Sequence, residues 1–205
     1  MFILPGYSFH TQVFCGVNAS LYRGKRDADG QPVLVKALID EYPSHSSIAQ
    51  FRHENAIERE LGLERVVRPI ELMESGHGLV LVWADPGGEP LAKMLAHGPL
   101  EVSKALRIAE LIASTLELIH VRSFIHKNIN SENILVDAAV TNAHLSGFGL
   151  AARLAHEFPQ LTSAEALDAA LAYMAPEQTG RMNRIVDRRS DLYSLGIVLY
   201  EMLTG

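Results

Sequence analysis

The chain has 205 residues, of which 48% are hydrophobic and 20% charged, so it can bury one substantial core or two small ones, and intrinsic disorder is excluded. Its formal net charge is −6 and it carries no cationic block, so nucleic acid is not an expected partner. Its one cysteine, Cys15, cannot form an internal disulfide, and no apolar run reaches the ~20 residues of a membrane span, so we expect a soluble, cytoplasmic protein.

The first eighty or so residues are predicted to be mostly β-structure. Strands are expected at residues 19–24 and 32–38, on either side of an Asp-Gly turn of the kind that closes hairpins. Two further apolar runs, at residues 67–73 and 78–83, predict a second pair of strands.

One helix is predicted between the two strand pairs. Residues 47–61 carry apolar side chains at helical spacing, and Ser46 or Ser47 is expected to cap the free backbone N–H groups. Glu54 falls on the same apolar stripe. Because an acid at a core-facing position is unfavourable when alone, we expect a cation to pair with it.

After residue 88 the periodicity changes from strand to helix. Residues 100–122 form a long amphipathic pattern, which predicts a helix. The remaining expected elements are an irregular loop, two short strands and a final helix capped by Ser190, at residues 125–133, 134–136, 144–146 and 191–203.

This change of periodicity predicts an α+β fold with two lobes. The β-rich N-terminal lobe is expected at residues 1–84 and the helical C-terminal lobe at residues 85–205, with a hinge at about residues 82–88. A crevice between two such lobes is the expected ligand site.

Several motifs stand in an order and at a spacing that resemble eukaryotic-type protein kinases. Lys36, within PVLVKAL, resembles the strand lysine of that family, and Glu54 resembles its helix partner. Three loop segments also match: HKNINSENIL from residue 126, SGFGLA from residue 146 and MAPE from residue 174. Asp191, within SDLYSLG, resembles the buried helix acid of the family. Six ordered matches along the chain imply the bilobal protein kinase fold.

The segment AYMAPEQTGRMNR resembles a narrower group, the N-terminal kinase-like domain of large bacterial chains that continue into an ATPase module and a sensor histidine kinase. This resemblance implies bacterial signalling, with protein partners or downstream signalling domains. The chain ends at Gly205, before the last helices of a kinase C-lobe, so we expect a fragment with a truncated C-lobe.

The resemblance implies ATP as a ligand. Lys36 would contact the α and β phosphates, and Glu54 would hold the lysine in place. The adenine would bind at Val82 and Ala84, whereas Trp83 between them is expected to be a packing residue. A Lys36–Glu54 pair that only ties the helix to the sheet is the alternative.

Four positions depart from the family pattern at its catalytic centre. Asn128 stands at the position of the catalytic acid and Asn130 at that of a lysine, so a proton acceptor and a cation are both missing. Gly147 replaces the principal metal ligand, which leaves Asn133 as a weak ligand, so Mg²⁺ binding is expected to be weak or absent. Ala170 replaces a threonine that hydrogen-bonds the catalytic acid in Ser/Thr kinases.

Histidine and cysteine are two further residue types that could form a site. The nine histidines show no spacing typical of metal ligands, and His126 is expected to support the backbone of its loop. Cys15 is expected to be a small buried hydrophobic residue rather than a reactive thiol.

Three function classes therefore stay open. The preferred one is a pseudokinase, a regulatory or scaffolding module that binds nucleotide without efficient phosphotransfer. The second is an active Ser/Thr protein kinase with atypical catalytic residues. The third is an interaction domain that binds no nucleotide.

Overall fold

The computed structural model describes residues 4–16, 19–40, 42–75, 78–154, 171–179 and 185–205. The chain divides into two compact units, Met1–Pro86 and Gly87–Gly205. We call them the N-terminal unit and the C-terminal unit and describe each by itself. The first is mostly sheet and the second mostly helix, which confirms the α+β class.

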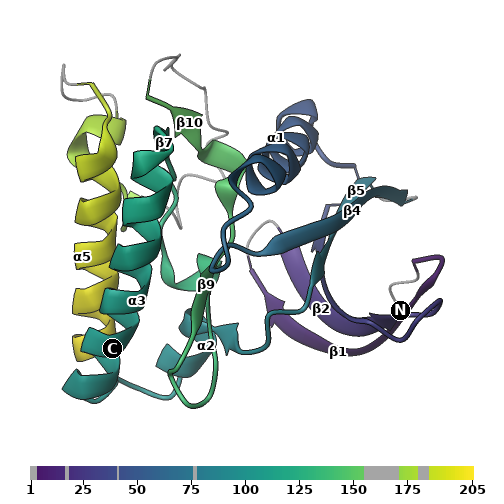
Figure 1. The fold of residues 1–205 in the computed structure, drawn as a ribbon, viewed down its shortest axis with the longest axis horizontal. Helices are drawn as coiled ribbons and strands as arrows, with labels where there is room; N and C mark the ends of the chain where they lie inside the picture. Colours follow the sequence, from purple (N-terminus) through teal and green to yellow (C-terminus); the bar gives the residue numbers. More distant parts are fainter. Residues whose placement is uncertain (1–3, 17–18, 41, 76–77, 155–170, 180–184) are drawn as a thin grey trace. The chain divides into compact units, whose positions relative to one another are not determined.

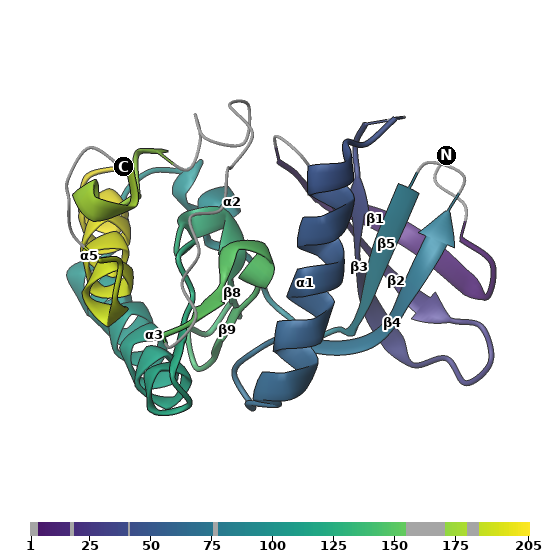
Figure 2. The same ribbon diagram turned by 90° about the horizontal axis from the view of Figure 1, so that it is seen from above.

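A five-stranded antiparallel sheet forms most of the N-terminal unit, and all five of its strands are labelled in Figure 2. The strand order is β1-β2-β3-β5-β4. Its strands are β1 (Tyr7–Cys15), β2 (Ala19–Arg26), β3 (Pro32–Leu38), β4 (Arg68–Ser75) and β5 (Gly78–Ala84). Both predicted strand pairs are confirmed. Strand β1 was not predicted, because two register shifts in its pairing with β2 interrupt the alternation of buried and exposed side chains.

Helix α1 (His45–Leu61) packs on one face of this sheet (Figure 2). Its N-cap is Ser44, whose side-chain oxygen accepts a hydrogen bond from the backbone N–H of Ser47. The prediction of Ser46 or Ser47 as the cap is wrong, because both already lie inside the helix whereas Ser44 has the extended backbone that a cap needs. Gly62 ends the helix in a left-handed conformation, with φ of 51°.

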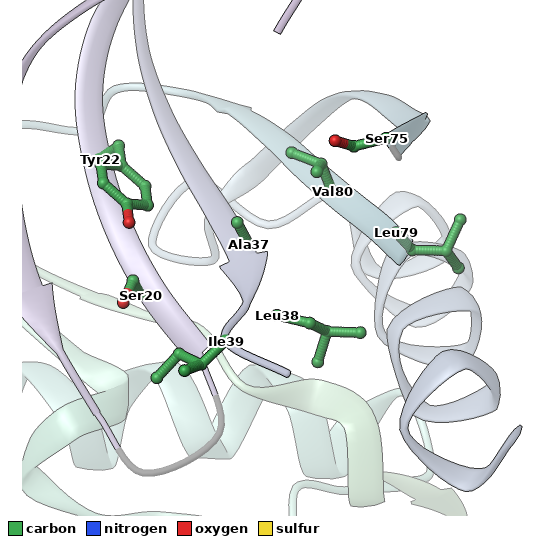
Figure 3. Close-up of a pocket in the computed structure, with 8 residues that line it drawn as sticks. All are labelled: Ser20, Tyr22, Ala37, Leu38, Ile39, Ser75, Leu79 and Val80. Carbon is green, nitrogen blue, oxygen red and sulfur yellow. The ribbon is translucent and has the colours of Figure 1, made fainter. Parts of the chain in front are cut away.

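The other face of the sheet carries a hydrophobic core of its own. Its buried members are Leu4, Tyr7, Val33, Val35, Ala37, Val80 and Val82. Strand alternation places these side chains opposite Lys36, which points to α1. A cavity of about 210 Å³ lies where β3 and β4 end and β5 begins (Figure 3). Its lining consists of Ser20, Tyr22, Ala37, Leu38, Ile39, Ser75, Leu79 and Val80.

Two helices that lie side by side, α3 (Val102–Val121) and α5 (Arg188–Thr204), dominate the C-terminal unit (Figure 1). Helix α3 confirms the predicted amphipathic helix. It buries the apolar stripe read from the sequence, namely Ile108, Leu111, Ile112, Leu116 and Ile119. The short helix α2 (Leu91–Leu95), which precedes it, was not predicted.

Short strands and 3₁₀ turns connect these helices. The strands are β6 (Glu89–Pro90), β8 (Ile134–Val136) and β9 (Ala143–Leu145), which form one sheet, and β7 (Phe124–Ile125) and β10 (Ala152–Arg153), which form another. The turns are η1 (Ser131–Asn133), η2 (Phe148–Leu150) and η3 (Pro176–Thr179). Strand β8 has the predicted bounds, and β9 begins one residue earlier than predicted.

Helix α5 begins earlier than the sequence suggested. Asp187 is its N-cap and accepts a hydrogen bond from the backbone N–H of Arg189. Ser190 was predicted as the cap, but it lies inside the helix, where its buried hydroxyl donates a 2.7 Å hydrogen bond to Glu177. Among the helices of the described ranges, none combines the length and apolar character needed to cross a bilayer.

Candidate functional site

The N-terminal unit brings Lys36 and Glu54 together. Lys36 lies on β3 and points to α1, where its Nζ is 2.9 Å and 2.8 Å from the two carboxylate oxygens of Glu54. The lysine side chain is 16% exposed and the glutamate side chain 3%. The acid on the core-facing stripe therefore has its cation, and part of the lysine side chain stays accessible.

A second buried acid, Glu58, lies one helical turn after Glu54. One of its carboxylate oxygens accepts a 2.8 Å hydrogen bond from the indole nitrogen of Trp83, which is itself fully buried. The other, Oε1, is the buried side-chain polar atom left without a hydrogen-bond partner within the described ranges. Burial and the neighbouring charge of Glu54 raise the pKa of Glu58 well above its ordinary value.

Sequence reasoning missed Glu58, although its spacing from Glu54 was a usable signal. Residues four apart share a helix face, so Glu58 lies on the same sheet-facing stripe as Glu54. Two acids on that stripe would then share the single cation Lys36. Trp83 is a packing residue as predicted, and its hydrogen bond to Glu58 adds a specific partner that hydrophobicity alone does not indicate.

The proposed adenine contacts occupy different surroundings. The Val82 side chain is buried in the hydrophobic core on the face of the sheet opposite Lys36. Ala84, at the end of β5, is partly exposed, and Asp85 beyond it forms an ion pair with Arg23 at 2.6 Å. Of the two predicted contact residues, Ala84 is therefore the one that is partly accessible.

The segment from Phe14 to Ala19 is described only at its ends. Strand β1 ends at Cys15, and the backbone N–H of Gly16 donates to the carbonyl of Ala19. Residues 17 and 18 lie outside the described residues. The expectation that Cys15 is buried is wrong, because Cys15 is exposed. It lies at the end of β1, after the second register shift in the pairing of β1 with β2.

In the C-terminal unit, Asp191 holds the backbone of the loop that begins at His126. This fully buried carboxylate accepts hydrogen bonds from the backbone N–H groups of His126 and Lys127, at 2.9 Å and 2.8 Å, and from the ring of His120 at 2.8 Å. Lys127 has a positive φ of 65°. Asp191 thus fixes a loop conformation that is unfavourable for an isolated residue.

His126 supports the same loop from inside. Its Nε2–H donates to the backbone carbonyl of Ser146 at 3.0 Å, its Nδ1 accepts from the backbone N–H of Asn128, and its ring packs on Phe148 with centroids 4.2 Å apart. These contacts occupy both ring nitrogens of a fully buried side chain. His126 therefore holds backbone in place, and neither nitrogen remains for a metal.

The three asparagines of the loop form a hydrogen-bonded cluster, which we call the amide cluster (Asn128, Asn130 and Asn133). The Asn130 amide nitrogen donates to Asn128 Oδ1 at 3.0 Å, and its oxygen caps η1 by accepting from the backbone of Glu132 and Asn133. The Asn133 amide nitrogen donates to the backbone oxygen of Asn128 at 3.0 Å. The cluster is electrically neutral, and its side chains are bonded mainly to the loop itself.

Gly147 adjoins the amide cluster. It has a left-handed backbone, with φ of 86°, and its carbonyl accepts a 3.4 Å hydrogen bond from the Asn128 side chain. A Cβ atom built at Gly147 would overlap the side-chain amide of Asn133. The structure thus brings together three of the four positions at which the sequence departs from the kinase pattern, Asn128, Asn130 and Gly147. The fourth, Ala170, lies outside the described residues.

Asp137, which follows β8, does not take the place of a missing carboxylate. Asp137 is engaged in the turn between β8 and β9, where it accepts hydrogen bonds from Thr141 and Asn142 that lower its pKa. The described residues contain no group of three or more His, Cys, Asp or Glu side chains placed to hold a metal ion. The donor set around Gly147 is one of amides and carbonyls, which does not fit the carboxylate-dependent binding of Mg²⁺.

Comparison with known proteins places nearly all of the chain in one family. The family model of the protein kinase domain matches residues 7–205. The chain is 31% identical over 196 residues to the serine/threonine-protein kinase pkn2 of Myxococcus xanthus, covering 93% of this chain and 23% of that protein. It is 30% identical over 192 residues to the serine/threonine-protein kinase PrkC of Bacillus subtilis, covering 93% of this chain and 29% of that protein.

A third relative is similar over the same region. The serine/threonine-protein kinase PknL of Mycobacterium tuberculosis is 26% identical over 201 residues, covering 97% of this chain and 49% of that protein. The chain thus spans less than half of the length of each of these three relatives. Because the family match extends over almost every described element, from β1 to α5, we conclude that the chain belongs to the protein kinase domain family.

Proposed function

We propose that this chain is a pseudokinase: a kinase-family module that binds ATP without Mg²⁺, does not transfer phosphate efficiently, and acts as a regulatory or scaffolding element in bacterial signalling. The observation that carries the proposal is the neutral amide cluster beside Gly147. It stands where phosphoryl transfer requires an acid, a cation and a metal ligand.

The proton-transfer role is the first to be lost. An amide oxygen is not basic at neutral pH, so Asn128 cannot accept the proton of an attacking hydroxyl, a loss of roughly 10²- to 10⁴-fold in rate. Both polar atoms of its side chain already have partners, since Oδ1 accepts from Asn130 and Nδ2 donates to the Gly147 carbonyl.

The metal role is the second. Mg²⁺ is bound through carboxylates and phosphates, and it dehydrates reluctantly for neutral ligands. Gly147 supplies no side chain, and the Asn133 amide is turned to the loop backbone. We therefore expect any nucleotide binding to be independent of Mg²⁺.

The N-terminal unit supports nucleotide binding. Lys36 is a cation held by both oxygens of Glu54, and its partial exposure leaves donors for phosphate oxygens. An ammonium of this kind neutralises phosphate charge without a metal. ATP is accordingly the proposed ligand, with Lys36 as its principal charged contact.

Partners and location follow from the same proposal. A module without phosphotransfer acts through binding, so we propose protein partners or downstream signalling domains as the recipients of its signal. The exposed thiol of Cys15 suits a reducing compartment, which supports the cytoplasm.

An active Ser/Thr protein kinase is the second candidate. It is favoured by the relatives named serine/threonine-protein kinase, to which the chain is up to 31% identical. It requires some group other than Asn128 and Gly147 to orient the hydroxyl and hold the metal. An interaction domain without nucleotide is the third, favoured by the ability of the Lys36–Glu54 pair to serve folding alone.

A phosphotransfer assay separates these candidates. The purified chain is incubated with Mg²⁺ and ATP labelled at the γ-phosphate, alone and with a generic basic protein. We expect no labelling of either protein above that of a Lys36→Met variant. Clear labelling that Lys36→Met abolishes would overturn the proposal in favour of the active kinase.

A further inference from the structure

Glu58 is a buried acid to which the proposed function gives no role. It is 1% exposed and lies on the face of α1 that packs against the sheet. Its Oε2 accepts the 2.8 Å hydrogen bond from the Trp83 indole, while its Oε1 has no hydrogen-bond partner in the part of the chain that the structure describes. Burying an ionised carboxylate with one oxygen unpartnered is costly, so this geometry favours a Glu58 that carries a proton.

Glu58 belongs to the same group of side chains as the proposed phosphate contact, Lys36. The lysine Nζ lies 2.9 Å and 2.8 Å from the two oxygens of Glu54. It also lies 5.8 Å from the ring centroid of Trp83, whose N–H donates to Glu58, and 5.2 Å from that of Phe51. We call these five residues the Lys36 cluster. The rings of the cluster add a favourable contact for a cation.

One proton decides the charge of the Lys36 cluster. The charges that act on Glu58 come from Glu54 on its own helix and from Lys36 on β3, and β5 contributes the Trp83 hydrogen bond. Burial and the charge of Glu54 raise the pKa of Glu58 well above its ordinary value. With the proton in place, one ammonium balances one carboxylate. Without it, the cluster holds an excess negative charge.

The second strand that packs on α1, β4, leaves this balance to the cluster. Its charged residues are Arg68, Glu71 and Glu74, and all three are exposed. Exposed charges are screened by water and salt, whereas buried ones are screened much less. The charge around Lys36 is therefore set mainly from within the cluster.

We infer that Glu58 is a positioning residue of the Lys36 site, which by holding or releasing one proton sets the charge around the ammonium and so the affinity of Lys36 for phosphate oxygens. This deepens the proposed function and rests on it for ATP as the ligand. A phosphate anion is attracted when the cluster is neutral and opposed when it carries the excess negative charge. By linkage, the bound anion favours the proton on Glu58 to the same extent.

The fluorescence of Trp83 tests this inference in the wild-type chain. Trp83 is the one tryptophan of the sequence, and its indole donates directly to Glu58, so its emission responds to the charge there. We follow the emission between about pH 5 and pH 9 without Mg²⁺, with and without saturating ATP. A transition is expected that Glu58→Gln lacks. ATP is expected to move its midpoint upward by about one pH unit, which equals a tenfold preference for the protonated form.

Calorimetry measures the same linkage from the side of the ligand. Relative to Glu58→Gln, the wild-type chain is expected to lose about tenfold in ATP affinity between the low and the high end of this pH range. The comparison cancels the titration of the ATP phosphates, which is common to both proteins. Glu60→Gln is the matched control, because it neutralises an exposed acid on the same helix, and it should follow the wild-type profile.

The outcomes separate this inference from the proposed function. A Trp83 transition that bound ATP does not move, or equal pH profiles of ATP affinity in the wild type and Glu58→Gln, would overturn the inference and leave the proposed function standing. Tripolyphosphate, which has phosphates but no base, is titrated in parallel. Glu58-dependent binding of tripolyphosphate without binding of ATP would support the inference and overturn nucleotide binding. Absence of binding by both anions would overturn both.

Discussion

The Lys36–Glu54 pair of the N-terminal unit keeps the charged residues of the kinase family pattern. The amide cluster of the C-terminal unit does not. In the first, both charged residues are present and bonded to each other at 2.8 Å and 2.9 Å. In the second, the charged residues are replaced by amides and a glycine that bond to one another and to the loop backbone. Charge is retained at one place and removed at the other.

The difference shows that support of the loop and chemistry at the loop are separable. Asp191 and His126 hold the backbone of the loop through bonds that need no catalytic group, and both are present and buried. Within the loop that these two residues hold, hydrogen bonds link Asn128 to Asn130 and to Asn133. The fold therefore does not require carboxylates at positions 128 and 147, and selection for structure alone does not keep them.

The largest expected effect on stability comes from breaking the Lys36–Glu54 ion pair. Lys36→Met leaves Glu54 and Glu58 buried together without a cation, so we expect the free energy of unfolding to fall by about 3 kcal/mol, as measured by chemical denaturation. Lys93→Met is the control, because it breaks an ion pair with Glu89 whose two side chains are 40% and 47% exposed, and it should cost less than about 0.5 kcal/mol. Similar losses for both variants would contradict the structural importance of the buried pair.

The pH dependence of stability tests the buried charges of the N-terminal unit in a second way. The pKa of Glu58 is raised well above its ordinary 4.5 by burial and by Glu54, with Lys36 and the Trp83 hydrogen bond acting in the opposite direction. The folded chain therefore binds more protons than the unfolded chain above pH 4.5, and the Glu58 contribution to stability falls as pH rises from 4.5 to the raised pKa.

Glu58→Gln tests this sign directly. The glutamine can keep the hydrogen bond from Trp83 through its oxygen, but it cannot ionise. We expect the variant to be more stable than wild type at pH 8, by roughly 2 kcal/mol, and the difference to shrink toward pH 4.5. A pH profile of unfolding that is parallel for the two proteins would show that Glu58 does not titrate in this range.

A smaller effect on stability is expected from a substitution in the amide cluster. Asn130→Ala removes the cap of η1 and the bond to Asn128, so it should lower the free energy of unfolding by about 1 kcal/mol, with no dependence on pH between 5 and 9. Asn142→Ala, at an exposed asparagine in the turn between β8 and β9, should stay within about 0.5 kcal/mol of wild type. A pH-dependent loss at Asn130 would contradict the neutrality of the cluster.

The sequence was informative where a pattern had a regular period or a fixed motif spacing. The stripe on α1 placed Glu54 against the sheet, and the motif order placed Asn128, Asn133 and Gly147 in adjoining loops. It failed where local geometry decided the outcome. The register shifts of β1 hid that strand and exposed Cys15, and several serines or acids near each helix start could have served as the cap.

The details inside the site lay beyond sequence reasoning for a similar reason. That the second carboxyl group, Glu58, bonds to Trp83 depends on how α1 sits on the sheet, which composition does not determine. The overlap between Asn133 and a side chain at position 147 depends on the pairing of two three-residue strands. Motif spacing identified the residues, but only the structure shows that the Asn133 side chain lies against Gly147.

The most direct measurement is the affinity of the chain for ATP with and without Mg²⁺, by isothermal titration calorimetry. The account predicts binding whose Kd changes by less than about twofold when Mg²⁺ is added and that Lys36→Met weakens. Binding that tightens by about tenfold or more with Mg²⁺ would contradict it, because the metal would then have protein ligands that the amide cluster does not offer. Absence of binding in both conditions would contradict the nucleotide-binding role of Lys36.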